Sequence, residues 1–298
     1  MPTAFIAEYG NSGPVIAFLG EYDALPGLSQ LAISSKKSAG KLAGHACGHH
    51  LFGTASVAAA IRVKNWLIEN NVNGTVRFYG CPAEEGGSGK VYLSRAGLFD
   101  DVDIALHWHP SSVNAANPGA ALANKSAKFR FKGVSAHAAG SPEKGRSALD
   151  AVESMNYMVN MMREHIPQDA RIHYVITDGG KAPNVVPDFA EVYYYARHQD
   201  RTVVIDLFER VKKAAEGAAL GTDTIMSFEM IGGTHELLPN ITLQKIIYNN
   251  LIKIGGYQYD DDELNFASNI SISLGNISLD TTFSEGIAPY TDNAKAYG

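Results

Sequence analysis

The hydrophobic pattern of residues 126–230 changes in the order strand, helix, strand, strand, helix, strand, and this order constrains the fold more than any other feature of the chain. Polar and apolar residues alternate over 126–132, which predicts a half-exposed strand. The pattern of 147–166 predicts a helix, with Ser147 as its N-cap and Pro167 directly after it. The other predicted elements are strands at 171–177, 188–197 and 224–230 and a helix at 200–216. This order is the ferredoxin-like split βαβ unit, so we expect a complete α+β domain over 124–236.

The residues on both sides of this unit have the pattern of an α/β domain. Residues 15–19 form a continuous apolar run, which is typical of a strand buried in a parallel sheet. Further strands are predicted at 75–79 and 103–106, and helices at 51–69 and 241–254. From Gly255 onward we expect no further helix or strand. We therefore predict an α/β fold in which a mostly parallel-sheet domain (1–123 and 237–298) carries the inserted ferredoxin-like domain (124–236).

The composition excludes several classes of protein. The formal net charge is -6 and no basic stripe is present, which argues against nucleic-acid binding. No run of about 18 apolar residues and no basic leader with an apolar stretch is found, so we expect no membrane span and a cytoplasmic location. Two cysteines are too few for a disulfide scaffold, and Cys81 is expected to be a small buried hydrophobic residue.

Four segments place side chains that bind metals just after a predicted strand or just before a predicted helix. They are GEYDALP at 20–26, HACGHH at 45–50, PAEEGG at 82–87 and HWHP at 107–110. Ligands of an open α/β sheet bind at the carboxyl ends of its strands, so these segments are expected to converge on one crevice. Three histidines and a cysteine within six residues, in a chain with 10 histidines, favour a site for zinc or a similar divalent ion.

The residues themselves leave several roles open. Asp23 suits a ligand, a bridging carboxylate, a residue that orients a ligand histidine, or a simple turn residue. Adjacent residues of an extended chain point in opposite directions, so one of Glu84 and Glu85 would bind metal while the other faces water as a general base. Taken alone, such a pair is typical of a solvated surface. His107 and His109 share one face of a strand, and we predict His109 as the ligand. His107 would then either support a ligand from outside the metal's coordination sphere or contact the substrate.

Together and in this order, the motifs resemble those of the M20 family of metallopeptidases and amidohydrolases, in its aminoacylase and auxin-conjugate hydrolase branch. The resemblance extends over nearly the whole chain and includes GVSAHAAGSPEKGRSALDA at 133–151 and GGKAPNVVPDFAEVYYYAR at 179–197. It implies a catalytic domain with a lid domain through which two subunits pair as a homodimer. The implied reaction is hydrolysis of the amide bond of an N-acyl or N-aroyl amino acid, such as aminobenzoyl-glutamate, or of a dipeptide-like substrate, with one or two Zn or Mn ions.

The resemblance also implies roles for residues whose own signals are weak, since a lone histidine, asparagine or arginine in a loop or at a strand end is typical of polar surface. Through it, His137 is expected to contact the reacting carbonyl in the partner subunit's active site, and Asn184 and Arg197 are expected to bind substrate. The implied roles in the first domain are metal ligands for Cys47, His49, Glu85 and His109, general base for Glu84, and a carboxylate near the metals for Asp23.

Two departures from the family pattern qualify these expectations. His50 stands where relatives have an aspartate. The chain is also expected to lack the first helix and strand of family chains and a later segment that supplies a further histidine ligand, because no histidine follows Tyr257. One alternative is therefore a catalytically impaired subunit that binds metal and dimerises. A structural zinc site is disfavoured, because a closed structural site has no use for a base-like glutamate beside its ligands.

Overall fold

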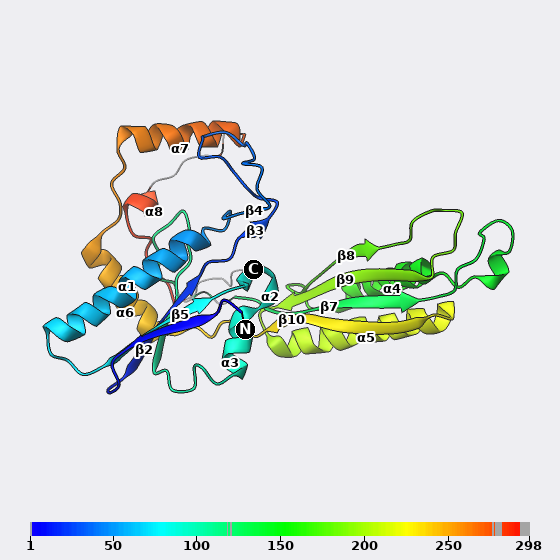
Figure 1. The fold of residues 1–298 in the computed structure, drawn as a ribbon, viewed down its shortest axis with the longest axis horizontal. Helices are drawn as coiled ribbons and strands as arrows, with labels where there is room; N and C mark the ends of the chain where they lie inside the picture. The colour runs from blue at the N-terminus through cyan, green and yellow to red at the C-terminus, as the bar shows by residue number, and fades with distance from the viewer. Residues whose placement is uncertain (1, 118, 120, 276, 278–281, 293–298) are drawn as a thin grey trace. The chain divides into compact units, whose positions relative to one another are not determined.

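The fold is described from a computed structural model, in which the chain forms two compact units (Figure 1). The structure describes residues 2–117, 119, 121–275, 277 and 282–292. The first unit consists of Met1–Asn117 and Asn240–Asp292, and the second unit contains Pro118–Pro239. Parts of the predicted catalytic segment 237–298, namely 276, 278–281 and 293–298, lie outside the described residues. None of the helices in the described part of the chain is long and apolar enough to cross a membrane.

A four-stranded sheet forms the centre of the first unit, with the strand order β1-β5-β2-β6. The strands β2 (Val15–Glu21), β5 (Thr75–Cys81) and β6 (Ile104–Leu106) run parallel, as predicted. The edge strand β1 (Phe5–Tyr9) pairs antiparallel with β5 and was not predicted. All five of its residues are exposed, so its sequence carries no alternation between buried and exposed positions.

Helices cover both faces of this sheet, which explains the apolar strands. The helix α1 (His49–Glu69) packs on one face, where its Ala60 and Leu67 meet Val76 and Phe78 of β5. The other face packs against α3 (Gly89–Arg95) and the loop after it; its buried residues are Ala17, Tyr79, Cys81 and Leu93. Alternate residues of β5 thus face opposite layers. The Cys81 side chain is fully buried, which confirms the prediction made for it.

The end of the first unit contains more helix than the sequence pattern indicates. The helix α6 (Ile241–Ile254) was predicted, but α7 (Asp261–Ser273) and α8 (Thr282–Glu285) were not, so the expectation of no helix after Gly255 is wrong. The helix α7 begins with a capping box, in which Asp260 and Glu263 each accept a hydrogen bond from the other's backbone N–H. The cap satisfies two N–H groups at the start of the helix, and none of the residues of α7 is buried.

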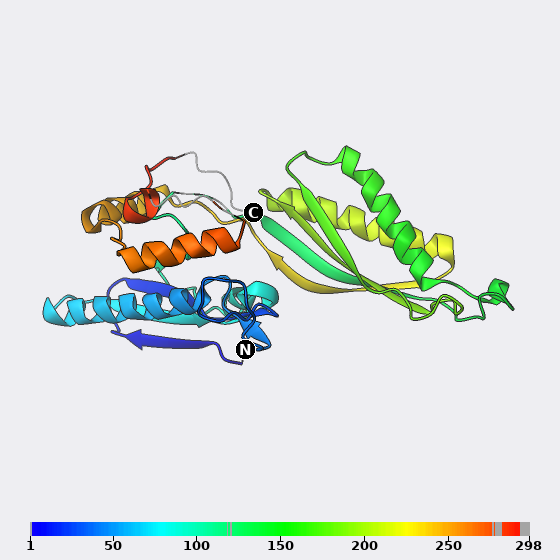
Figure 2. The ribbon, with the colours of Figure 1, turned by 90° about the horizontal axis from the view of Figure 1, so that it is seen from above.

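The second unit has the predicted ferredoxin-like order. Its antiparallel sheet has the strand order β10-β7-β9-β8, and both helices lie on the same face of the sheet (Figure 2). The buried face of the sheet and these helices form one hydrophobic core, which includes Phe129, Met155, Val192 and Leu207. The elements are β7 (Ala123–Lys132), η1 (Pro142–Lys144), α4 (Ala148–Met162), η2 (Arg163–His165), β8 (Arg171–Asp178), β9 (Phe189–His198), α5 (Arg201–Thr222) and β10 (Ile225–Thr234).

Candidate metal centre

A short hairpin and a left-handed glycine bring the HACGHH segment to the carboxyl end of the sheet. The strands β3 (Leu25–Pro26) and β4 (Ala43–Gly44) pair antiparallel, so the residues after β4 return to those after β2. Gly48 then adopts a φ of 80° and caps α1. A Cβ at this position would lie 3.0 Å from the ring of Pro110, so both backbone conformation and space require glycine between Cys47 and His49.

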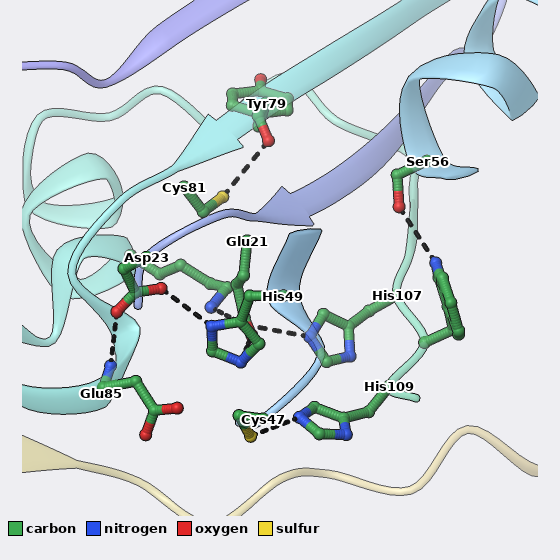
Figure 3. A network of polar contacts seen from close by, with 12 residues as sticks. Glu21, Asp23, Cys47, His49, Ser56, Tyr79, Cys81, Glu85, His107 and His109 are labelled. Atoms are coloured by element: carbon green, nitrogen blue, oxygen red, sulfur yellow. Dashed lines mark hydrogen bonds and ion pairs between the residues drawn. The ribbon is translucent and has the colours of Figure 1, made fainter. Parts of the chain in front are cut away.

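Cys47, His49 and His109 lie close enough together to share one ion (Figure 3). One ligand atom from each lies within 4.8 Å of the others. The Cys47 Sγ is 3.3 Å from Nε2 of His109. The Nδ1 of His109 is 2.9 Å from the carbonyl oxygen of Pro110, to which it donates, so the lone pair of the neutral ring is on Nε2, beside the thiol. The structure thus brings His109 rather than His107 into this group.

Asp23 links a histidine of this group to the glutamate segment. Its Oδ1 accepts a hydrogen bond of 2.9 Å from Nδ1 of the fully buried His49, and its Oδ2 accepts one of 2.9 Å from the backbone N–H of Glu85. A carboxylate that holds one nitrogen of an imidazole fixes the ring and leaves the other nitrogen for a metal. Of the roles left open for Asp23, its contacts match that of orienting a ligand histidine.

Glu84 and Glu85 lie in the first turn of the short helix α2 (Glu84–Gly87), not in extended chain. The premise that the chain is extended at these two residues is therefore wrong. Ala83 has a φ of 56°, an uncommon left-handed conformation that turns the chain sharply after β5. Oε1 of Glu85 is buried without a hydrogen-bond partner among the described residues, whereas Glu84 is exposed. Although the residue as a whole is exposed, partial burial of its carboxyl group and the charge of Glu21 raise the pKa of Glu84.

The donor atoms of this cluster fit a divalent cation. Burial and the neighbouring carboxylates, Glu85 first among them, raise the pKa of the Cys47 thiol to about 11. Nε2 of His49 and Oε1 of Glu85 are buried without hydrogen-bond partners in the described part of the chain. Thiolate, imidazole and carboxylate are the donors that Zn and related ions take, and a positive ion would satisfy these atoms together. Glu85 lies outside the group of three but near Cys47, whose pKa it raises.

Glu21 and Lys90 belong to this cluster, although neither was singled out from the sequence. Glu21, the last residue of β2, is buried, and its Oε1 makes an ion pair with Lys90 Nζ and lies 3.3 Å from Nε2 of His107. Burial by itself would raise the pKa of Glu21, but the hydrogen bond from His107 and the charge of Lys90 lower it to about 2. The GEYDALP motif contains the only available signal, a second acid two residues before Asp23.

The other predicted site residues lie in the second unit. The segment with His137 pairs with the segment before β9 through a bridge between His137 and Val185 and a 3.1 Å hydrogen bond from Ala138 N–H to Asn184 O. Nδ1 of the exposed His137 accepts hydrogen bonds from the N–H groups of Ala139 and Gly140, at 3.2 and 3.0 Å. Arg197, near the end of β9, is half-buried and stacks on Tyr195.

Comparison with known proteins agrees with this architecture. The family described as the peptidase dimerisation domain of M20 matches residues 123–223. Over 100% of its length the chain is 47% identical to one of the subunits of p-aminobenzoyl-glutamate hydrolase of Escherichia coli, and it covers 62% of that protein. It is 32% identical to the mouse Xaa-Arg dipeptidase over 97% of its length and covers 65% of that protein. The chain thus spans less than two thirds of these relatives.

Solved structures share the fold at lower sequence identity. An aminobenzoyl-glutamate utilization protein from Klebsiella pneumoniae matches 90% of the chain with a TM-score of 0.65 and 21% identity, and 66% of that protein is covered. A dinuclear metal-binding peptidase of the M20 family from Bacillus subtilis matches 85% of the chain with a TM-score of 0.59 and 22% identity, and 67% of it is covered. The chain therefore contains an M20 peptidase dimerisation domain, is similar along its whole sequence to these relatives, and shares the fold of an M20 peptidase.

Proposed function

We propose that this chain is a metal-dependent amidohydrolase that cleaves the amide bond of an N-acyl or N-aroyl amino acid or of a dipeptide-like substrate. The proposal depends on one observation above all: Cys47, His49 and His109 lie within reach of one ion, with the Glu84 carboxylate exposed beside them. We assign Cys47, His49, Glu85 and His109 as ligands of one or two Zn or Mn ions. Asp23 holds His49 in the required orientation.

Hydrolysis of an amide bond at this centre needs a Lewis-acidic metal ion and a general base beside it. A divalent ion in this centre supplies Lewis-acid chemistry, which makes a water molecule more acidic and polarises a carbonyl group. Glu84 removes a proton from the attacking water and later gives it to the nitrogen of the leaving amine, so that one carboxylate serves as base and then as acid. The raised pKa of Glu84 suits this exchange, because it brings the carboxyl group closer to neutral pH.

We assign substrate contacts to three residues of the second unit. Because Nδ1 of His137 accepts two backbone hydrogen bonds, the proton of the neutral ring is on Nε2, which makes this atom a donor for the oxygen of the reacting carbonyl. The guanidinium group of Arg197 is suited to a bidentate pair with the substrate carboxylate. Asn184 would add an amide hydrogen bond. We also propose that two chains form a homodimer through this unit, a proposal that the match to the dimerisation domain supports.

The relatives support the proposed substrate class, and the free thiols support the proposed compartment. The two relatives described above have names that point to cleavage of an amide or peptide bond to glutamate or arginine. This supports aminobenzoyl-glutamate and similar N-aroyl amino acids as first substrates to test. Both cysteines are free thiols, which fits the reducing cytoplasm that we propose as the location.

The test is hydrolysis of a panel of N-acyl amino acids, N-aroyl amino acids and dipeptides with added Mn or Zn, together with the metal content per chain. We expect turnover of at least one N-aroyl or N-acyl amino acid that depends on metal and is lost in a chelator. Bound metal without hydrolysis of any substrate would instead identify a metal-binding, dimerising subunit without catalytic activity.

A further inference from the structure

The buried carboxylate of Glu21 is held at one oxygen and leaves the other facing the metal cluster. Both hydrogen bonds that it accepts from the described residues go to Oε1, one from Lys90 Nζ and one from Nε2 of His107. Its Oε2 lies 3.1 Å from Nε2 of His49. The side chain of Glu21 is 3% exposed and that of His49 is 1% exposed, so water does not separate the two atoms from each other.

The contact between these two atoms lacks the geometry of a hydrogen bond, although it is short enough for an ion pair if the ring is protonated. Nδ1 of His49 donates its proton to Asp23, so in the neutral ring Nε2 carries a lone pair. Nε2 has no hydrogen-bond partner among the described residues, even though the Glu21 oxygen is 3.1 Å away. A lone pair facing a carboxylate oxygen in a buried place is unfavourable unless a positive charge lies between them. A positive charge between the two atoms would satisfy both, either a metal ion on the neutral ring or a proton that pairs the ring with Glu21.

Glu21 also belongs to a second group of possible ligands. One ligand atom each of Glu21, His49 and Glu84 lies within 4.8 Å of the others. This group shares His49 with the group of Cys47 and His109. Neighbouring acidic side chains alone would be weak support for a site, but here they surround a fully buried imidazole with an unsatisfied nitrogen.

We propose that Glu21 is a further ligand of the divalent cation, which it binds through Oε2 beside Nε2 of His49. This inference rests on the proposed function, because it assumes the same metal centre, and it adds a ligand to the four assigned above. Lys90 and His107 then act as positioning residues. Carboxylates that bind a metal are themselves held by hydrogen bonds, and Oε1 of Glu21 has two such partners.

The test is a titration with cobalt(II), whose visible absorption bands report the number and type of its ligands. The wild type, Glu21→Gln and the control Glu8→Gln are compared, since Glu8 is an acid of the same unit that pairs with Arg77. We expect Glu21→Gln to bind cobalt at least about 100-fold more weakly than the wild type and with changed d–d bands, a loss at or above the upper end for residues that only support a ligand. Glu8→Gln should bind as the wild type does.

Two results would overturn the proposal. Wild-type affinity and bands in Glu21→Gln would exclude Glu21 from the centre. A weaker affinity with unchanged bands would mean that Glu21 only supports His49. Failure of the wild type to bind any cobalt would instead reject the proposed function, so the two failures are distinguishable.

A second variant keeps the proposal testable if Glu21→Gln does not fold. Lys90→Met keeps the apolar stem of the side chain but removes one of the two partners of Oε1 of Glu21, while His107 remains. We expect about 10- to 100-fold weaker cobalt binding, since one partner of a ligand is lost, and Lys90→Arg should recover most of it. Cobalt affinity of Lys90→Met equal to that of the wild type would contradict the role of Glu21, provided that circular dichroism shows a folded protein.

Discussion

Two buried glutamates, one in each unit, share a low pKa but have opposite surroundings. Glu191 lies on β9 of the second unit, and both of its oxygens have partners: Thr177 and Lys128 at Oε1, and Arg130 at Oε2, 2.6 Å away. Burial raises the pKa of Glu191, but these partners outweigh it and lower the pKa to about 2. Glu21 has the same pKa, yet its Oε2 faces an imidazole nitrogen that has no hydrogen-bond partner in the described residues.

The number of partners around the two oxygens distinguishes a structural carboxylate, such as that of Glu191, from a carboxylate in a binding site. A fully paired buried charge needs nothing more, and its removal affects mainly stability. A buried carboxylate with one oxygen beside an imidazole nitrogen that has no hydrogen-bond partner among the described residues can still bind a metal ion through that oxygen. A low pKa alone therefore does not identify a functional acid, because the unpaired atoms around it are what distinguish Glu21 from Glu191.

The largest expected difference between the units is in catalysis. We expect Glu84→Gln to lower kcat/KM by about 10²- to 10⁴-fold, the usual contribution of a general base, while metal remains bound. Glu191→Gln is the matched control, with the same change of charge and shape in the other unit, and should keep kcat/KM at wild-type values under conditions where it is folded. Steady-state kinetics on a hydrolysed N-aroyl amino acid measures both, and full turnover by Glu84→Gln would reject its role as base.

Thermal unfolding with and without metal gives the next largest effect. An ion that binds only the folded protein stabilises it by about 2.7 kcal/mol at a free concentration of 100 times Kd. We expect Zn or Mn to raise the Tm of the wild type and of Glu191→Gln but not of His49→Ala, which loses the histidine shared by both ligand groups. An equal rise in His49→Ala would place the stabilising ion elsewhere.

Loss of the Glu191 charge should destabilise the protein without affecting metal binding. Glu191→Gln removes the negative charge and one of the two acceptor oxygens that Lys128 and Arg130 share, and we expect a loss of about 1–3 kcal/mol in the free energy of unfolding. Urea denaturation at neutral pH measures it. A variant as stable as the wild type would show that the network contributes nothing to stability.

The same network predicts how stability depends on pH. The folded-state pKa of Glu191 is about 2, below its ordinary value of 4.5, so its contribution is complete above pH 4.5 and is lost as the pH falls toward 2. The difference in unfolding free energy between the wild type and Glu191→Gln should therefore shrink over this range. A difference that stays constant from pH 5 to pH 2.5 would contradict the assignment.

The smallest effect is expected at an exposed ion pair. Arg146 and Asp223 are 2.8 Å apart, but the Asp223 side chain is 80% exposed. Asp223→Asn keeps a residue that tolerates the left-handed conformation at this helix end, where φ is 53°. We expect a change below about 1 kcal/mol in the free energy of unfolding by urea, because water screens exposed pairs. A larger loss would show that solvent exposure is a poor guide to the strength of these pairs.

Helices and strands that bury one face could be predicted from the sequence. Elements whose residues are all exposed or only partly buried could not. The split βαβ order of the second unit and the parallel strands of the first follow from hydrophobic period and the turns between elements. The exposed edge strand β1 and the exposed helix α7 carry little such signal, and α7 depends on a cap between Asp260 and Glu263.

The candidate site shows the same limit at the level of single residues. The donor types and their positions after strands indicate a metal site around Cys47, His49 and His109. The contacts of Glu21 depend on Lys90 and His107, which lie 69 and 86 residues further along the chain. Spacing in the sequence does not distinguish the carboxylate of Glu21 from that of Asp23. Tertiary packing decides which of the two lies beside the histidine nitrogen that has no hydrogen-bond partner in the described residues.

The most direct test of the account is anomalous diffraction at the zinc absorption edge from crystals of the protein grown with zinc. We expect a peak at about 2.3 Å from Cys47 Sγ and about 2.0–2.1 Å from nitrogens of His49 and His109. We also expect an oxygen of Glu21 at about 2.0–2.2 Å from this ion or from a second ion beside His49. A map with no peak among these residues, or with zinc only elsewhere on the chain, would contradict the account.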